Sequence, residues 1–267
     1  MSQGVIYSVR GPKMLPEMTW EEVAEELKRT DMVIVTVGST EEHGPHMPLA
    51  ADTIQGVEVS KRIVTRLAAD GIPAVVGPAI PFGISTQFMD FPGTISLSPA
   101  TLGAVIKEIC ASLIHHGFRK IVLLVAHNEN LGVMYSAVQE LSQQYDARVV
   151  LVHWMTLVKN HYVDILKTKE GGHGGEGETA RVLASIPELV RMERARAHHP
   201  SRREKLEEDE PIHVGGGVFD PPRKMSAISS VGCIGDPTVA TAETGEKCYD
   251  LIVGWACKVI KRHFNLV

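Results

Sequence analysis

Short apolar runs alternate along this chain with longer stretches whose apolar residues recur at helical spacing. The clearest apolar run, residues 120–126, reads KIVLLVA and is apolar at every position after its first. Such a run is typical of a strand buried on both faces, as in a parallel sheet that helices cover on both sides. Three further runs of strand length cover residues 32–37, 73–80 and 148–154.

The stretches with helical periodicity lie before, between and after these runs. Thr19 and Glu22 have the spacing of a capping box, and Ser98 or Thr101 can cap a later helix. We expect helices over residues 19–29, 53–69, 98–117, 130–144, 155–167, 178–185 and 240–263. Strands that alternate with helices predict βαβ units, an α/β fold class and a mainly parallel, doubly wound sheet.

No internal repeat and no convincing domain boundary interrupts this pattern. We therefore expect a single domain over residues 1–267. Residues 194–237 are dominated by Pro, Gly and charged residues, and they have few features of a flexible linker. We expect them to form a long, ordered excursion from the domain.

The charge and hydropathy of the chain exclude some partners. The formal net charge is −5, and the basic cluster between Arg191 and Arg203 is followed at once by acidic residues up to Glu210, which argues against a nucleic-acid partner. No apolar run approaches the roughly 20 residues of a membrane span, and the first residues lack the apolar core of a secretory signal. We expect a cytoplasmic protein with no membrane partner.

The four cysteines are scattered along the chain at positions Cys110, Cys233, Cys248 and Cys257. None has the C-x-x-C spacing of a zinc or redox motif, and a disulfide framework is improbable at this chain length. We expect reduced thiols that are mostly buried.

Ionisable residues follow the predicted strands at the points where they end. Glu41 and His43 follow the strand at 32–37, and His127 and Glu129 follow the strand at 120–126. In open α/β sheets, ligands bind beyond the carboxyl ends of the strands, so these side chains should converge at one edge of the sheet.

Residue types at this edge indicate a metal site. Together with Asp52, which arrives after a Pro-rich loop, they supply two imidazoles and three carboxylates but no thiolate. This donor set suits Zn²⁺, Mn²⁺ or Fe²⁺. Five ligands exceed the three that usually hold one catalytic zinc, and they suit two divalent ions about 3.5–4 Å apart. A hydroxide that bridges the two ions would balance the charge, and the reaction implied is hydrolysis.

A purely structural interpretation of the same residues remains open. The loop could satisfy backbone donors, with Asp52 as a plain helix N-cap. Glu42 is expected to be solvated or to support a ligand. His46 either braces a ligand carboxylate or packs in the loop.

Three motifs in the sequence resemble the creatininase (creatinine amidohydrolase) family. The first runs from Glu41 to Asp52 and reads EEHGPHMPLAAD, the second is His127-x-Glu129, and the third reads HGGEGET from His173 to Thr179. The resemblance extends to the Gly-Asp-Pro turn at 235–237 and the final helix, so it covers nearly the whole chain.

This resemblance implies a three-layer α/β/α domain, a binuclear metal centre and a homo-oligomer, often a hexamer. The metal ligands that it implies are Glu41, His43, Asp52, His127 and Glu129, with Asp52 bridging. It implies that His173 passes a proton to the leaving group and that Ser85 contacts the substrate. Glu178 either pairs with His173 and fixes its tautomer or opens a helix whose dipole favours an acid.

The family hydrolyses C–N bonds in cyclic or linear amides and formamides, and one branch is thought to hydrolyse a ring C–C bond in inositol-derived diketones. This sequence lacks the tryptophan that creatininase carries before its proton-shuttling histidine, since residues 167–172 read KTKEGG. It also has Asn128 where an aromatic residue such as tyrosine is expected between the two ligands. We therefore expect Asn128 to contact a small, polar, ring-shaped or sugar-like substrate in place of creatinine.

Three functions are compatible with these residues. The first is metal-dependent hydrolysis of an amide-type C–N bond, and the second is hydrolysis of a C–C bond in a cyclic diketone. The third is non-catalytic metal binding on the same scaffold.

Overall fold

Four parallel strands form the central sheet of the protein. The computed structural model describes residues 10–168, 172–199 and 223–266. The strands are β1 (Met32–Val37), β2 (Val75–Ile80), β3 (Lys120–Val125) and β4 (Arg148–His153), in the order β2-β1-β3-β4. All four predicted strands are therefore confirmed, each to within two residues.

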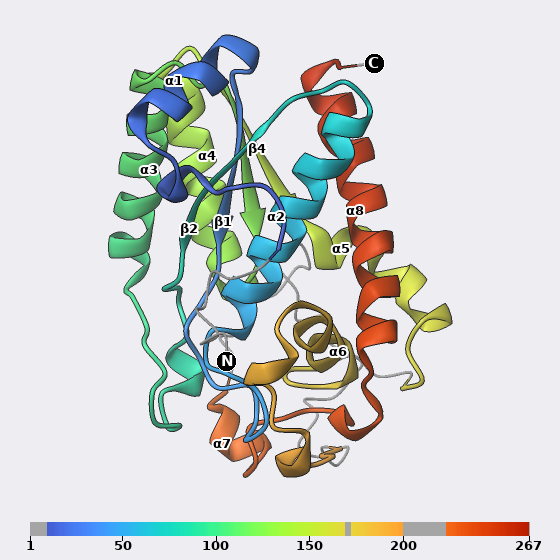
Figure 1. Cartoon of the computed structure of the whole chain (residues 1–267). Helices are drawn as coiled ribbons and strands as arrows, with labels where there is room; N and C mark the ends of the chain where they lie inside the picture. Colours follow the sequence, from blue (N-terminus) through green and yellow to red (C-terminus); the bar gives the residue numbers. More distant parts are fainter. Residues whose placement is uncertain (1–9, 169–171, 200–222, 267) are drawn as a thin grey trace.

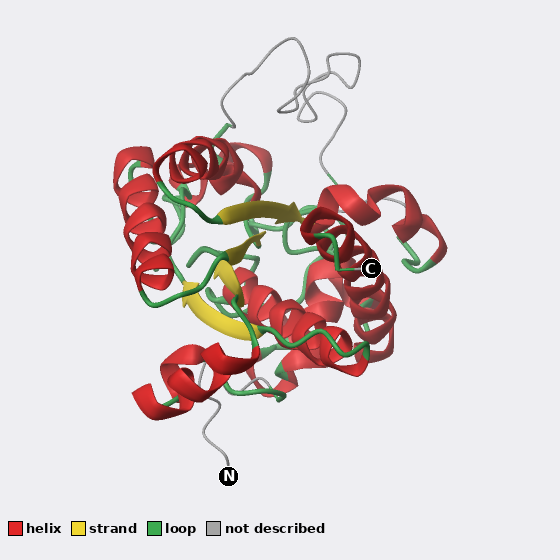
Figure 2. Cartoon of the chain, turned by 90° about the horizontal axis from the view of Figure 1, so that it is seen from above, coloured by secondary structure: helices red, strands yellow, loops and turns green. Residues whose placement is uncertain are grey.

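Helices cover both faces of this sheet and give a three-layer α/β/α structure (Figure 2). On one face lie α2 (Ala51–Ala69), α5 (Trp154–Val158) and α8 (Ala242–Phe264), and α8 contacts both of the others. The other face is covered by α3 (Pro99–His115) and α4 (Leu131–Gln144). In the part of the chain that the structure describes, no helix has the length and apolar composition needed to cross a bilayer.

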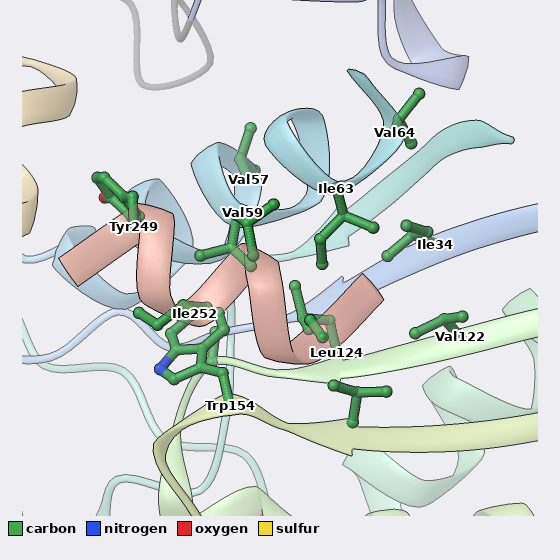
Figure 3. Close-up of a cluster of buried hydrophobic side chains, with 14 of the residues drawn as sticks. Ile34, Val57, Val59, Ile63, Val64, Val122, Leu124, Trp154, Tyr249 and Ile252 are labelled. Carbon is green, nitrogen blue, oxygen red and sulfur yellow. The ribbon is translucent and has the colours of Figure 1, made fainter. Parts of the chain in front are cut away.

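Alternate residues of each strand point to the two layers. On β1, Ile34 packs toward α2 and α8, as Figure 3 shows, whereas Val33 and Val35 belong to the opposite core. All three side chains are fully buried. Each such side chain contributes about 1.5–3 kcal/mol through the transfer of apolar surface from water, which explains why both faces of the strands are apolar.

Helix boundaries follow local capping chemistry. Thr19 and Glu22 form the expected capping box at the start of α1 (Trp20–Arg29), and Ser98 caps α3 through the backbone N–H of Thr101. The predicted helix at 155–167 is only partly correct, because α5 gives way to a 3-10 helix, Lys159–Asp164. The 3-10 segment places the Tyr162 hydroxyl 3.1 Å from the buried guanidinium of Arg181, a contact that helical periodicity does not encode.

The order in which the chain adds strands to the sheet reverses between β1 and β3. From β1 the chain crosses to β2 on one side, whereas β3 and β4 lie on the other, so these neighbours flank the topological switch point. In Figure 1, α6 (Glu176–Ser185) and α7 (Met225–Ile228) lie at the lower end of the molecule, beyond the sheet.

Part of the predicted excursion over 194–237 is described. Residues 200–222 lie outside the described residues, whereas residues 223–237 contain α7 and the first residue of a short 3-10 helix, Pro237–Val239. The single domain expected over residues 1–267 stays a prediction.

Candidate metal centre

The loops after β1, β2 and β3 meet at the switch point, where one buried amide ties them together. Asn130 donates from Nδ2 to the carbonyl of Gly38 at 2.9 Å and accepts from the N–H of Ile84 at 3.0 Å. Gly83 passes so close that a Cβ there would lie 2.6 Å from Asn130 Oδ1. Sequence analysis did not identify Asn130, although it directly follows the H-x-E motif.

Asp52 lies between the two imidazoles that the sequence proposes as ligands. Its Oδ1 lies 3.2 Å from His43 Nε2, and its Oδ2 lies 3.0 Å from His127 Nδ1. Asp52 is the second residue of α2, and Ala50 occupies the N-cap position, so Asp52 is not the plain N-cap of the structural interpretation. The positive end of the α2 dipole favours a carboxylate here.

Backbone carbonyls orient both imidazole rings. His43 Nδ1 lies 3.2 Å from the carbonyl oxygen of Glu41, and His127 Nε2 lies 2.8 Å from that of Ile84. If these nitrogens carry the protons, His43 Nε2 and His127 Nδ1 are left to face Asp52. A metal-binding histidine usually donates its second N–H to a carbonyl or carboxylate in this way.

Two further carboxylates approach His127. Oε2 of Glu41 and Oε2 of Glu129 lie 3.3 Å and 3.1 Å from His127 Nε2. Ser39 Oγ donates to the same Glu41 oxygen at 2.9 Å, and Gln87 donates to Oε1 of Glu129 at 2.6 Å. These hydrogen bonds fix the orientation of both carboxylates.

Three sets of side chains have donor atoms that all lie within 4.8 Å of one another. The sets are Glu41 with Asp52 and His127, His43 with Asp52 and Glu178, and Glu41 with His43 and His173. Glu129 is in none of them, although it contacts His127. Asp52 Oδ2 is buried without hydrogen-bond geometry to any partner among the described residues. A buried carboxylate oxygen left in this state fits a site for cations.

The electrostatics of the cluster also favour a positive charge. Burial alone would favour neutral imidazole, but the carboxylates of Asp52 and Glu178 raise the pKa of His43 to about 10. The carboxylates of Glu41 and Glu129 likewise outweigh burial and raise the pKa of His127 well above its usual value. At Asp52, burial alone would raise the pKa of the carboxyl group, but the two neighbouring histidines outweigh this effect and lower the pKa. The site therefore favours the charged form of Asp52 and positive charge on the two imidazoles beside it.

His173 lies at the side of the centre, stacked between two rings. Its ring centroid lies 4.2 Å from that of His43 and 4.3 Å from that of Phe88. Its Nε2 lies 2.5 Å from the backbone carbonyl of Glu42 and 3.4 Å from Oε1 of the same residue, while Nδ1 lies 3.9 Å from Glu41 Oε1. Nδ1 is thus the nitrogen that faces the centre.

The carboxylate beside His173 is Glu42, whereas Glu178 lies elsewhere. Glu178 Oε2 accepts a hydrogen bond from the N–H of Gly174 at 2.8 Å and lies 3.7 Å from His43 Nε2. The sequence left two interpretations of Glu178 open, a pair with His173 or an acid at the start of a helix. The structure places Glu178 in the first turn of α6 and shows no contact between Glu178 and His173 among the described residues. Glu42 is buried and its Oε1 has no hydrogen-bond partner among the described residues, so it is not solvated.

The two expected substrate contacts differ in exposure. Ser85 is fully buried, and its hydroxyl lies 2.5 Å from that of Ser39. Asn128 is exposed and lies 2.8 Å from the ring of His153. His46 is buried, and its Nε2 lies 2.8 Å from Thr179 Oγ1. Its ring therefore packs between the loop that follows β1 and α6.

Comparison with known proteins finds relatives over most of the chain. The family model described as "Creatininase: Creatinine amidohydrolase" matches residues 16–260. The chain is 30% identical over 266 residues to creatinine amidohydrolase of Pseudomonas putida, which covers 93% of this chain and 96% of the relative. It is 32% identical over 232 residues to the mycofactocin precursor peptide peptidase of Mycolicibacterium smegmatis, covering 86% of this chain and 85% of the relative. A third relative, 3-dehydro-scyllo-inosose hydrolase of Thermotoga maritima, is 26% identical over 269 residues, covering 91% and 81%.

Solved structures show the same fold. A crystal structure of creatininase superimposes with a TM-score of 0.75 at 28% identity and covers 94% of this chain and 97% of its own. A manganese form of creatininase and a Zn–Zn form of a creatininase variant also superimpose with TM-scores of 0.75 at 28% identity, covering 94% and 95% of this chain and 98% and 99% of their own. The nitrogen and oxygen donors assembled here suit both of these metals.

Proposed function

Because the chain belongs to the creatininase family, we propose that it is a metal-dependent hydrolase that cleaves a C–N bond of an amide, cyclic amide or formamide. The observation that carries this proposal is the position of Asp52, whose two carboxylate oxygens face two different imidazoles at 3.2 Å and 3.0 Å. A carboxylate placed in this way can bridge two cations.

The proposed ligands are those that the sequence suggested. Glu41 and His127 complete one site with Asp52, and their donor atoms lie within 4.8 Å of one another. His43 would hold the second ion with Asp52, and Glu129, which lies 3.1 Å from His127, is the fifth proposed ligand by family resemblance. Two zinc or manganese ions are the proposed cofactors, with iron as a further possibility. When bound, such ions supply a polarised carbonyl and a water whose pKa is lowered to about 7.

The protein residues around the centre would hold the substrate and move a proton. His173 presents Nδ1 toward Glu41 at 3.9 Å while its other nitrogen lies against Glu42, so Nδ1 can deliver a proton to the departing nitrogen. Glu178 lies 3.7 Å from His43 and supports the orientation of that ring. Asn128 and Ser85 are the proposed substrate contacts, and Ser85 also hydrogen-bonds Ser39, which donates to Glu41.

The substrate is proposed to be small and polar. A linear amide is supported by the similarity to a peptide peptidase, and a cyclic amide by the similarity to creatinine amidohydrolase. The competing C–C hydrolysis is supported by the similarity to 3-dehydro-scyllo-inosose hydrolase. The assembly as a homo-oligomer, hexameric by resemblance, and the cytoplasmic location also stay predictions.

A screen of the metal-loaded protein tests these alternatives. Cyclic amides, formamides, short peptides and oxidised inositols are offered in parallel, and each product mixture is analysed for ammonia, amines and new carboxylates. Ammonia, an amine or a guanidine formed together with the new carboxylate, free or on the opened ring, supports C–N cleavage, whereas a new carboxylate without a new nitrogen group supports C–C cleavage. Metal binding without any turnover supports the non-catalytic alternative.

A further inference from the structure

Side-chain hydrogen bonds join the tips of β3 and β4 next to the metal centre. His153, the last residue of β4, lies opposite Val125 at the end of β3. Its Nε2 lies 2.8 Å from Asn128 Oδ1, and its Nδ1 lies 2.8 Å from Thr156 Oγ1. The three side chains form one continuous polar chain at the carboxyl end of the sheet, where ligands bind in folds of this type.

The chemistry of the three side chains determines which atom donates and which accepts in each hydrogen bond. The amide oxygen of Asn128 can only accept, so His153 donates from Nε2. A neutral ring with its proton on Nε2 must accept at Nδ1, so Thr156 donates its hydroxyl proton. Burial lowers the pKa of His153, which is consistent with a neutral ring.

Two N–H donors of Asn128 remain at one end of this series of hydrogen bonds. The amide nitrogen of Asn128 carries two N–H groups, and it has no hydrogen-bond partner among the residues that the structure describes. Asn128 is exposed, and its sequence neighbours His127 and Glu129 both belong to the centre. The Nε2 atom of His127 lies 3.1 Å from Oε2 of Glu129. Asn128 closely follows β3, so these donors lie at the carboxyl edge of the sheet, where ligands bind in folds of this type.

We propose that Asn128, oriented by His153 and Thr156, selects substrates that carry a carbonyl or carboxylate oxygen beside the bond that is cleaved. The inference rests on the proposed function for the position of the reacting bond. It narrows the expected polar substrate to one with a hydrogen-bond acceptor at this point, since N–H donors bind a charged acceptor more strongly than a neutral hydroxyl. His153 and Thr156 are positioning residues in this arrangement.

The direction of the hydrogen bonds can be measured without any substrate. In protein with ¹⁵N-labelled histidine, His153 is assigned by comparison with the His153→Gln variant, and its ring nitrogens report the tautomer. We expect the proton on Nε2 in the wild type and in Thr156→Val. A proton on Nδ1 in the wild type would mean that the amide of Asn128 presents its oxygen outward, and this result overturns the proposal.

Selection is tested with two matched probes, N-formylglycine and N-(2-hydroxyethyl)formamide, which differ in a carboxylate and a hydroxymethyl group. Calorimetry with the metal-loaded wild type should show tighter binding of N-formylglycine. The Asn128→Asp variant keeps the acceptor for His153 but loses both outward donors, so it should bind N-formylglycine at least about tenfold more weakly. Its affinity for the alcohol probe should stay within about threefold.

The control is Gln143→Glu, which makes the same amide-to-carboxylate change on the exposed face of α4 and should leave both affinities unchanged. The proposal is overturned if the wild type does not prefer the carboxylate probe, or if Asn128→Asp weakens both probes equally. Failure of the proposed function has a different signature. Neither probe would then be hydrolysed, although the preference in binding and its loss in Asn128→Asp would both be present.

Discussion

The ring of Phe88 stacks on the ring of His173, with centroids 4.3 Å apart and planes inclined by 19°. His43 lies on the opposite face of the same imidazole, with a centroid separation of 4.2 Å. Phe88 is buried and belongs to a 3-10 helix, Thr86–Phe88, directly after Ser85. The loop after β2 therefore holds in place the residue that we propose as proton donor.

Replacement of Phe88 by leucine should lower kcat by about tenfold without loss of metal. Leucine leaves the imidazole free to turn away from the centre, and an aromatic pair contributes roughly 0.5–1.5 kcal/mol beyond its buried area. Phe88→Tyr keeps the aromatic face and is the matched control, with kcat close to that of the wild type. Steady-state kinetics and metal analysis of both variants check this, and equal losses in the two variants would contradict a role for stacking.

His173→Ala should abolish most turnover and leave the metal content unchanged. A positioned acid or base contributes about 10²–10⁴-fold to a rate, and the proposed ligands do not include His173. Metal analysis by mass spectrometry separates this role from that of a ligand, since a ligand variant would lose an ion. His115→Ala, at the exposed end of α3, is the control for loss of an imidazole. Retention of wild-type turnover in His173→Ala would remove this residue from the mechanism.

Sequence patterns were sufficient for the strands and for the residues that surround Asp52. The apolar runs are local, and the rule that ligands bind at strand ends brings Glu41 and His127 together without coordinates. Contacts that depend on loop paths could not be obtained in this way. No spacing predicts that Phe88 reaches His173, or that Glu42, in place of Glu178, becomes the neighbouring carboxylate.

Asp52→Asn should lose most of the bound metal, because asparagine keeps the volume of the side chain but cannot bridge two cations as a carboxylate does. The wild type is expected to bind about two ions per chain, and the variant at most one with reduced affinity. Asp146→Asn, in the exposed turn before β4, makes the same change away from the site and should keep full occupancy. Titration of the metal-free proteins with zinc checks the prediction, and equal stoichiometry in the two variants would contradict the bridging role.

Arg181→Met should destabilise the metal-loaded protein by about 3 kcal/mol. Arg181 is only 2% exposed, and it donates to Gln55 Oε1 at 2.6 Å and to the Tyr162 hydroxyl at 3.1 Å. Methionine fills much of the space but leaves the buried amide oxygen of Gln55 without its donor, which costs more than the loss of the hydrogen bond itself. Arg196→Met changes an exposed arginine and should alter stability by no more than about 0.5 kcal/mol. Urea unfolding of the two variants measures the difference, and similar midpoints would show that the buried guanidinium contributes no more than a surface residue.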